Sequence, residues 1–282
     1  MKNKLGIVIV GLGRAGLARL RDLQSCNDCQ LVGTVSRREM GNMTFEDALS
    51  SQAVDAIILT TENKTHYEFA RAALQANKHV LVEFPLCLTH AQGSELFELA
   101  HQHHRVLQVE QIGLLTQNHA WLKNQCKTQA IAAINLEAGG DLQGWVEQAY
   151  RQGSVGHLCV GRLHVLFDLD HMAHLQTIDY SETQDGFDLK VDFISQKISK
   201  LNLHYQRRKD LTRFQQVCLT TVKGDKLISP LKKETKGLFL RDFQCFLNRL
   251  HGQGMPYVSD QAVLQVLQWA DAIDDAVKKF RD

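Results

Sequence analysis

The chain has 282 residues, a formal net charge of +1 and 44% hydrophobic residues. This length can bury one large core or two modest ones, and the balanced charge excludes the basic footprint that nucleic acids and anionic membranes attract. No apolar run is long enough to span a bilayer, and the first residues show no secretory signal pattern. The seven cysteines are scattered along the chain, which is typical of free thiols in a reducing compartment. We therefore expect a cytoplasmic protein with no nucleic-acid partner and no membrane partner.

The first predicted element is a strand that leads into a glycine-rich turn. The β-branched residues 7–10 precede Gly11, Gly13 and Gly16, and an amphipathic segment over 17–23 follows. The GxGxxG dinucleotide fingerprint requires this context: the first glycine makes the tight turn, the second admits the pyrophosphate and the third lets helix and strand pack closely. The helix start also offers free N–H groups to the phosphates. The alternative is a glycine turn in another kind of βα unit; the cofactor-binding interpretation involves Gly11, Gly13, Arg14, Ala15 and Gly16.

The end of the second predicted strand, over 30–35, indicates which dinucleotide is bound. NAD-binding sites usually carry Asp or Glu there to accept a hydrogen bond from the ribose 2′-hydroxyl. This chain has Ser36, Arg37 and Arg38 instead. A hydroxyl and two guanidinium groups suit a 2′-phosphate, although two solvated arginines in a loop would look the same. We expect NADPH as the cofactor, with NADH as a weaker donor.

Strands and helices continue to alternate up to about residue 115. Thr44 and Thr89 have the side chain and the position of helix N-caps. Predicted strands cover 55–60, 79–82 and 106–109, and predicted helices follow Thr44, cover 67–76 and run from Thr89 to 104. This alternation is typical of a doubly wound parallel sheet. We predict an α/β protein whose amino-terminal Rossmann domain covers 1–115.

The pattern changes after residue 115, where strands follow one another without helices between them. Such strands form antiparallel sheets. The predicted elements are helices over 118–127, 155–169, 238–250 and 260–280, a strand over 130–138, a polar loop from Gly139, and strands over 174–180, 187–194, 200–206, 214–222 and 226–229. We predict an α+β substrate domain over 116–282, with an open, largely antiparallel sheet and two closing carboxy-terminal helices.

This architecture and two short runs resemble the glucose-fructose oxidoreductase/inositol dehydrogenase superfamily. The run NKHVLVEFP over 77–85 is similar to the superfamily's KHVxxEKP run, and Thr61 to Asn63 with His66 is similar to a TPNxxH segment beside the nicotinamide ribose. The resemblance implies further cofactor contacts, from Thr60, Thr61, Glu62, Asn63, His66, Glu83 and Phe84.

A narrower resemblance is to the biliverdin reductase family. It is carried by the runs 11–16, 35–41, 46–51, 78–85 and 95–100, and it is strong over about the first 115 residues and looser afterwards. In the second half, GRLHVLF over 161–167 is similar to an SRxTxLF-like helix of cyanobacterial members. The resemblance implies NADPH-dependent hydride transfer to the central methine carbon of a linear tetrapyrrole, turning biliverdin into bilirubin.

Several positions depart from these family patterns. Phe84 stands where biliverdin reductases usually have Tyr, and Gly113 lies in a run, 110–115, where they usually have EHxELL. Sugar and cyclitol dehydrogenases use a Lys at position 84 and an Asp at position 160, where this chain has Phe84 and Val160. Neither side chain exchanges protons, so alcohol oxidation is disfavoured. The alternatives are an NADP-dependent oxidoreductase of the same superfamily with another small substrate, and a catalytically silent NADP-binding sensor or regulator.

The resemblance implies that the helix over 155–169 carries the catalytic groups. Arg162 is the first choice, to hold the propionates or to position a water, and His164 is a second candidate because imidazole donates protons near neutral pH. Their spacing places them on different helix faces, so we expect only Arg162 to point at the cofactor. Core packing or snorkelling would explain both residues equally simply. Glu83 is expected beside the nicotinamide, and Arg14 and Phe84 beside the substrate.

We expect no metal. Cys26 and Cys29 form a lone CxxC, which is a weak metal or redox motif. His164, Asp168, His171 and His174 have a spacing that crosses a helix end, and hydride transfer from a nicotinamide requires no metal. The sequence leaves a monomer and a homodimer open, because the superfamily uses the open sheet face for dimers whereas biliverdin reductases tend to be monomers.

Overall fold

The computed structural model describes residues 4–37, 41–171, 173–230 and 237–282. The chain divides into two compact units. One comprises Met1–Ile112 with Thr235–Val263, and the other comprises Gly113–Glu234 with Leu264–Asp282. Within the described ranges, no helix has the length and apolar character needed to cross a membrane.

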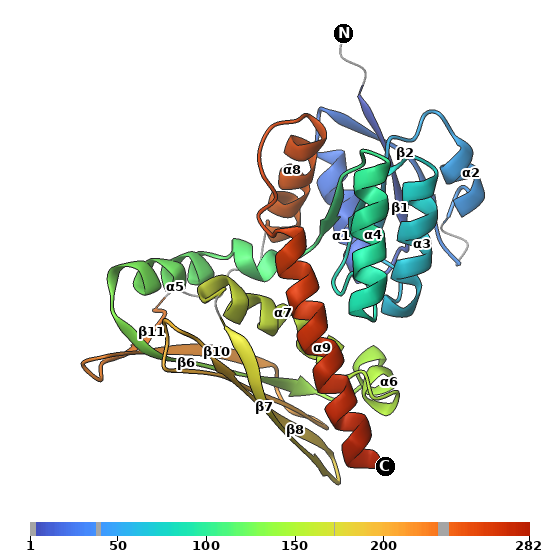
Figure 1. Ribbon diagram of the computed structural model, residues 1–282. Coiled ribbons are helices and arrows are strands. Elements are labelled where there is room, and N and C mark those ends of the chain that lie inside the picture. The colour runs from blue at the N-terminus through green and yellow to red at the C-terminus, as the bar shows by residue number, and fades with distance from the viewer. Residues whose placement is uncertain (1–3, 38–40, 172, 231–236) are drawn as a thin grey trace. The chain divides into compact units, whose positions relative to one another are not determined.

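The first unit is built on a five-stranded parallel sheet with the strand order β2-β1-β3-β4-β5 (Figure 1). All of these strands except the edge strand β2 are almost wholly buried because helices cover both faces, as expected of continuous apolar strands in a parallel sheet. The expected Rossmann architecture is confirmed. The strands are β1 (Leu5–Val10), β2 (Cys29–Val35), β3 (Ala56–Leu59), β4 (His79–Val82) and β5 (Leu107–Val109), and the intervening helices are α1 (Arg14–Gln24), α2 (Phe45–Ser50), α3 (Asn63–Gln75) and α4 (His90–Gln102).

Helix α8 (Leu238–Leu250) belongs to the first unit, whereas the sequence favoured a place in the second domain. Its apolar residues Phe243 and Phe246 join one buried cluster with Ile7 and Ile9 of β1. The helix packs beside α1 (Figure 1). An apolar stripe at helical spacing must be buried against some partner, and the sequence does not say which sheet provides it.

The second unit contains a six-stranded sheet with the order β11-β10-β6-β9-β8-β7. Every neighbouring pair is antiparallel except β6 and β9, which are parallel, so the expectation of a largely antiparallel sheet is confirmed. The strands are β6 (Ile131–Asp141), β7 (His174–Thr183), β8 (Gly186–Ile194), β9 (Lys200–Arg208), β10 (Phe214–Thr221) and β11 (Lys226–Ile228), and the helices are the short 3₁₀ helix η1 (Ile112–Leu115), which straddles the unit boundary, α5 (Gln117–Thr128), α6 (Trp145–Arg151), α7 (Val155–Leu169) and most of α9 (Asp260–Arg281).

The polar loop expected from Gly139 is wrong, because β6 continues to Asp141 and a short helix, α6, follows. A Cβ atom at Gly139 would lie 2.6 Å from the Phe214 ring, and one at Gly140 would lie 2.6 Å from Nη1 of Arg207. These glycines are therefore strand residues that leave room for large neighbours, rather than turn residues.

Helix α7 is buried along most of its length and is anchored to α9. Asp274 of α9 accepts hydrogen bonds at Oδ1 from the Gly156 N–H at 2.6 Å, and its Oδ2 lies 2.7 Å from Nδ1 of His157. Ser154, at the N-cap position, makes no side-chain capping bond, so the carboxylate of Asp274 satisfies an N–H group that the helix start leaves open. This anchor fixes the helix that carries Arg162 and His164.

Candidate functional site

The glycine turn has the three local geometries that the fingerprint requires. Gly11 has φ +96°, and a Cβ atom there would lie 2.7 Å from the Thr60 carbonyl oxygen. A Cβ at Gly16 would lie 2.0 Å from the Gly11 carbonyl oxygen, whereas one at Gly13 would meet nothing within 4 Å. The start of α1 has no side-chain cap. Open space and free N–H groups thus coincide at Gly13, where a pyrophosphate would bind.

Two alanine substitutions separate binding from packing at this turn. Gly13→Ala is expected to weaken dinucleotide binding about tenfold or more, because the added methyl group occupies the space of the pyrophosphate, and to leave the melting temperature nearly unchanged. Gly16→Ala is expected to lower the free energy of unfolding by about 1–3 kcal/mol through overpacking. Fluorescence titration with the dinucleotide and thermal denaturation measure the two effects. Wild-type affinity in Gly13→Ala would contradict a pyrophosphate at this turn.

Ser36 and Arg37 lie at the carboxyl end of β2, at the same sheet edge as the glycine turn. Arg37 is exposed, and its Nη1 lies 4.0 Å from Oε1 of Glu62, which precedes α3. Arg14, the first residue of α1, is also exposed. Arg38 lies outside the described residues. Two exposed cationic side chains, which make no closer ion pair with any described residue, are thus available near the point where a 2′-phosphate would lie.

The turn after β3 and the turn after β4 are tied together by His66. Its Nδ1 lies 2.7 Å from the Pro85 carbonyl oxygen and its Nε2 lies 3.1 Å from the Thr61 carbonyl oxygen. The ring is fully buried, and burial lowers the pKa of His66. Both ring nitrogens therefore face backbone carbonyls and neither is left for a cofactor, so His66 holds the two turns in place. Helix α3 begins at Asn63, a turn earlier than predicted.

Thr60, Thr61 and Phe84 occupy these turns in different ways. The Thr60 hydroxyl donates to the Gly11 carbonyl oxygen at 2.6 Å, which fixes the glycine turn from the neighbouring strand. Thr61 accepts from the Thr65 hydroxyl at 2.8 Å, and Phe84 is half-buried. The expected cofactor-contacting segments therefore share one edge of the parallel sheet.

Glu83 was expected to be a catalytic residue beside the nicotinamide, but its carboxylate is paired with an arginine inside the first unit. Oε1 of Glu83 accepts from Nε of Arg19 at 3.0 Å, and Nη2 of Arg19 lies 2.5 Å from Oδ2 of Asp242. The side chain of Arg19 is fully buried, and burial raises the pKa of Glu83 against the opposing effect of the Arg19 charge. Sequence reasoning missed this ion pair; the one indication was an arginine on the inward face of α1.

Glu110 completes a group that we call the acid cluster: Glu83, Glu110 and Asp242, arranged around Arg19. Glu110 is buried and its Oε1 accepts from the Ile112 N–H at 2.7 Å. Burial, followed by the nearby charges of Glu83 and Asp242, raises the pKa of Glu110 well above its usual value. Three carboxyl groups thus share one buried cation, which favours a protonated Glu110.

In the second unit, α7 directs Arg162 and His164 to different surroundings, as their spacing predicts. Cζ of Arg162 lies 5.6 Å from the ring centroid of Tyr205 on β9. Among the residues that the structure describes, the buried Nε of Arg162 and the buried Nε2 of His164 have no hydrogen-bond partner. Burial lowers the pKa of His164 to about 3. This lowered pKa disfavours His164 as a proton donor near neutral pH, because burial favours the uncharged imidazole.

Asp168 is four residues after His164 on α7, but its carboxylate pairs with His119 and Lys123 instead. Its Oδ2 lies 2.6 Å from Nε2 of His119 and 2.8 Å from Nζ of Lys123, both on α5. Burial raises the pKa of Asp168, but its hydrogen bonds to His119 and Lys123 outweigh burial and lower the pKa overall.

Across the described ranges, no three His, Cys, Asp or Glu side chains are arranged to hold a metal ion. Burial also raises the pKa of the Cys29 thiol to about 12, which disfavours a reactive thiolate.

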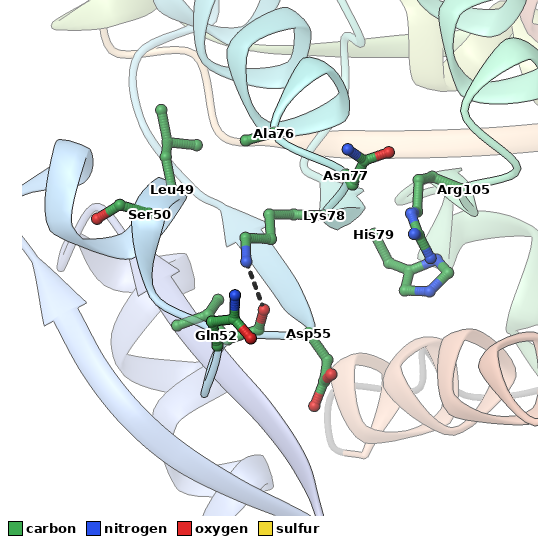
Figure 2. A pocket seen from close by; sticks show the side chains of 10 residues that line it. Leu49, Ser50, Gln52, Asp55, Ala76, Asn77, Lys78, His79 and Arg105 are labelled. Atoms are coloured by element: carbon green, nitrogen blue, oxygen red, sulfur yellow. Dashed lines mark hydrogen bonds between the residues drawn. The ribbon is translucent and has the colours of Figure 1, made fainter.

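A pocket of about 490 Å³ lies at the opposite edge of the parallel sheet, beside the residues that start β3 and β4 (Figure 2). Nζ of Lys78 donates to the carbonyl oxygens of Ser51 at 2.8 Å and Val54 at 2.9 Å. Burial and the charge of Arg105 lower the pKa of His79 to about 4. The lysine thus holds backbone carbonyls, and the pocket is remote from the strand ends that carry the glycine turn.

Comparison with known proteins identifies relatives along nearly the whole chain. Residues 5–111 match the model of an oxidoreductase family with an NAD-binding Rossmann fold. Biliverdin reductase A of Mus musculus is 33% identical over 264 residues, covering 89% of this chain and 88% of that protein. The Homo sapiens protein of the same name is 32% identical over 266 residues, with the same two coverages of 89% and 88%.

Solved structures agree on the fold. A biliverdin reductase from Synechocystis sp. PCC 6803, in complex with biliverdin and NADP⁺, has a TM-score of 0.81 at 22% identity, covering 96% of this chain and 98% of that one. A probable dehydrogenase from Thermotoga maritima has a TM-score of 0.80 at 17% identity and covers 98% of both chains. At these identities the structural likeness supports the architecture of both units.

Proposed function

We propose that this chain, which belongs to the biliverdin reductase family of NAD-binding Rossmann-fold oxidoreductases, reduces biliverdin to bilirubin with NADPH. The observation that carries the proposal is the similarity to two mammalian biliverdin reductases over 89% of the chain. An NAD(P)H-dependent oxidoreductase is the class that the family establishes. The choice of biliverdin within that class is the proposal.

The residues of the first unit fit a bound NADPH. The open space at Gly13 and the uncapped start of α1 would hold the pyrophosphate. Ser36, Arg37 and Arg38 would hold the 2′-phosphate, since guanidinium groups bind phosphate in a bidentate manner. When bound, the cofactor supplies a hydride, which goes to the central methine carbon of the tetrapyrrole. The preference for NADPH over NADH then follows from Ser36, Arg37 and Arg38 in place of an acidic residue directly after β2.

The second unit would hold the substrate and support proton uptake at a pyrrole nitrogen. Arg162 is the candidate to bind a propionate or to polarise the pyrrole system, because it is a buried cation without a carboxylate partner in the described part of the chain. His164 is neutral, and arginine is a poor acid. We therefore propose a water positioned near Arg162 as the immediate proton donor.

The apolar side chains at Phe84 and Val160 favour this reaction over alcohol oxidation. An alcohol dehydrogenation needs a group that removes the hydroxyl proton, and neither side chain does so. A flat conjugated pigment packs well against an aromatic ring such as Phe84. The second candidate function is reduction of another conjugated small substrate by the same cofactor, and it is favoured by the absence of the phenol that relatives carry at position 84.

The test is to mix the purified protein with NADPH and biliverdin and to follow the conversion of green pigment to yellow, with NADH in parallel. We expect turnover with a higher kcat/KM for NADPH. Arg37→Ala is expected to raise the KM for NADPH about tenfold through loss of a phosphate contact and to leave the KM for NADH unchanged. Tight NADPH binding without pigment conversion would refute biliverdin as the substrate and direct the search to other acceptors or to a sensor role.

A further inference from the structure

A cluster of two arginines and one tyrosine lies within the second unit, between α7 and the sheet. Arg162 comes from α7, and Tyr205 and Arg207 come from β9. The Cζ atoms of Arg162 and Arg207 lie 5.6 Å and 5.1 Å from the Tyr205 ring centroid. Arg162 is 6% exposed, Arg207 is 9% exposed and Tyr205 is fully buried. We call Arg162 and Arg207 the arginine pair.

Arg207 is held in a defined position by one side chain and one backbone carbonyl. Its Nε donates to the Tyr205 hydroxyl at 2.5 Å, and its Nη1 donates to the Asp141 carbonyl oxygen at 3.2 Å. A Cβ at the neighbouring Gly140 would lie 2.6 Å from that Nη1, so the glycine is needed for the guanidinium to lie there. These bonds use two of the five N–H donors of an arginine, which leaves most of the guanidinium edge available to a ligand.

No carboxylate neutralises the arginine pair within the described ranges. The other deeply buried arginine, Arg19, has two carboxylates at 2.9 Å and 2.5 Å, whereas neither member of the arginine pair makes an ion pair. The neighbours Tyr205 and Cys159 do not compensate, because burial raises the pKa of both groups and keeps them neutral. A buried charge without a compensating charge is strongly destabilising, so two such arginines beside one tyrosine ring indicate a site for an anion.

We infer that the arginine pair binds a propionate carboxylate of the tetrapyrrole, with Arg207 as a substrate-binding residue in addition to Arg162; this inference rests on the proposed function. Each guanidinium group offers a fork of N–H donors that matches the two oxygens of a carboxylate. The aromatic ring of Tyr205 keeps both groups oriented through cation–π contacts. The site recognises the acid side chain of the substrate rather than its conjugated ring system.

The experiment compares biliverdin with biliverdin dimethyl ester, which lacks both carboxylates, as substrates of the whole protein with NADPH. For the wild type we expect the KM of the ester to exceed that of the free acid tenfold or more, with similar kcat. Arg207→Gln is expected to raise the KM of the free acid several-fold toward that of the ester and to leave the KM of the ester unchanged. Thermal denaturation of each variant verifies folding.

Arg208 provides the matched control, because it neighbours Arg207 on the strand but is exposed and pairs with Asp188. Arg208→Gln is expected to keep the wild-type preference for the free acid. If Arg207→Gln does not fold, Arg207→Lys is the substitute, because it keeps the positive charge but loses the paired N–H donors of the guanidinium. It should give a preference for the free acid over the ester that is weaker than in the wild type. Equal KM values for the two pigments in the wild type would overturn this inference and leave the proposed function standing. Conversion of neither pigment would overturn the proposed function and this inference with it.

Discussion

Arg19→Met is expected to lower the free energy of unfolding by about 3–5 kcal/mol, because removing one partner of a buried ion pair leaves the remaining charges uncompensated. Arg19 lies 2.9 Å from Glu83 and 2.5 Å from Asp242. It also donates to the Phe239 carbonyl oxygen at 3.1 Å, so three segments of the first unit depend on one side chain. Urea denaturation followed by circular dichroism measures the loss.

Arg21→Met is the control for that measurement, since Arg21 lies on the same helix but is exposed. We expect a change within about 0.5 kcal/mol, as for most surface substitutions. The triple variant that combines Arg19→Met with Glu83→Gln and Asp242→Asn should recover part of the stability, because it also removes the uncompensated carboxylates. A loss in Arg19→Met no larger than in Arg21→Met would show that the acid cluster is not held by this cation.

The second large effect is a loss of stability on acidification through His164. Burial lowers its pKa from 6.5 to about 3 in the folded protein. Below pH 6.5 the unfolded chain takes up a proton that the folded imidazole does not, so the stability present above pH 6.5 is lost as the pH falls toward 3. Between pH 7 and pH 5 this single group should lower the free energy of unfolding by about 2 kcal/mol. Denaturant titrations at the two pH values measure the difference.

His164→Gln is expected to reduce this pH dependence by about that amount, and His174→Gln, which changes an exposed imidazole, is expected to leave it unchanged. Burial also lowers the pKa values of His66 and His79, so part of the pH dependence persists in the His164 variant. An identical pH dependence in the wild type and in His164→Gln would mean that His164 has the same pKa in the folded and the unfolded protein, and it would restore His164 as a candidate proton donor.

The neutral state of His164 narrows the chemistry of the proposed reaction. Glu83 is bound to Arg19, and Phe84 carries no proton. Of the catalytic candidates named from the sequence, we therefore keep only Arg162 in the proposed substrate site. In that proposal it acts by its charge rather than by giving up a proton, since the cofactor would supply the hydride.

The sequence by itself determined the features that depend on local structure. The glycine turn was predictable because the conformations of Gly11 and Gly16 follow from a strand and a helix that adjoin them in the chain. The N-caps Thr44 and Thr89 were predictable for the same reason, since each side chain accepts from an N–H three residues later. Strand and helix periodicity then fixed the parallel and the antiparallel sheets.

The tertiary structure alone decided which distant side chains meet. Glu83 and Arg19 are far apart in the sequence, and nothing local distinguishes a carboxylate that faces a cofactor from one that pairs with a buried arginine. Arg207 was not predicted because α7 and β9 must pack together before Arg162 and Arg207 lie beside the same tyrosine ring. The neutral state of His164 likewise depends on burial by segments remote in the chain. Ionisation and pairing are set by the complete three-dimensional surroundings of a group, whereas turns, caps and periodicity are set by its neighbours along the chain.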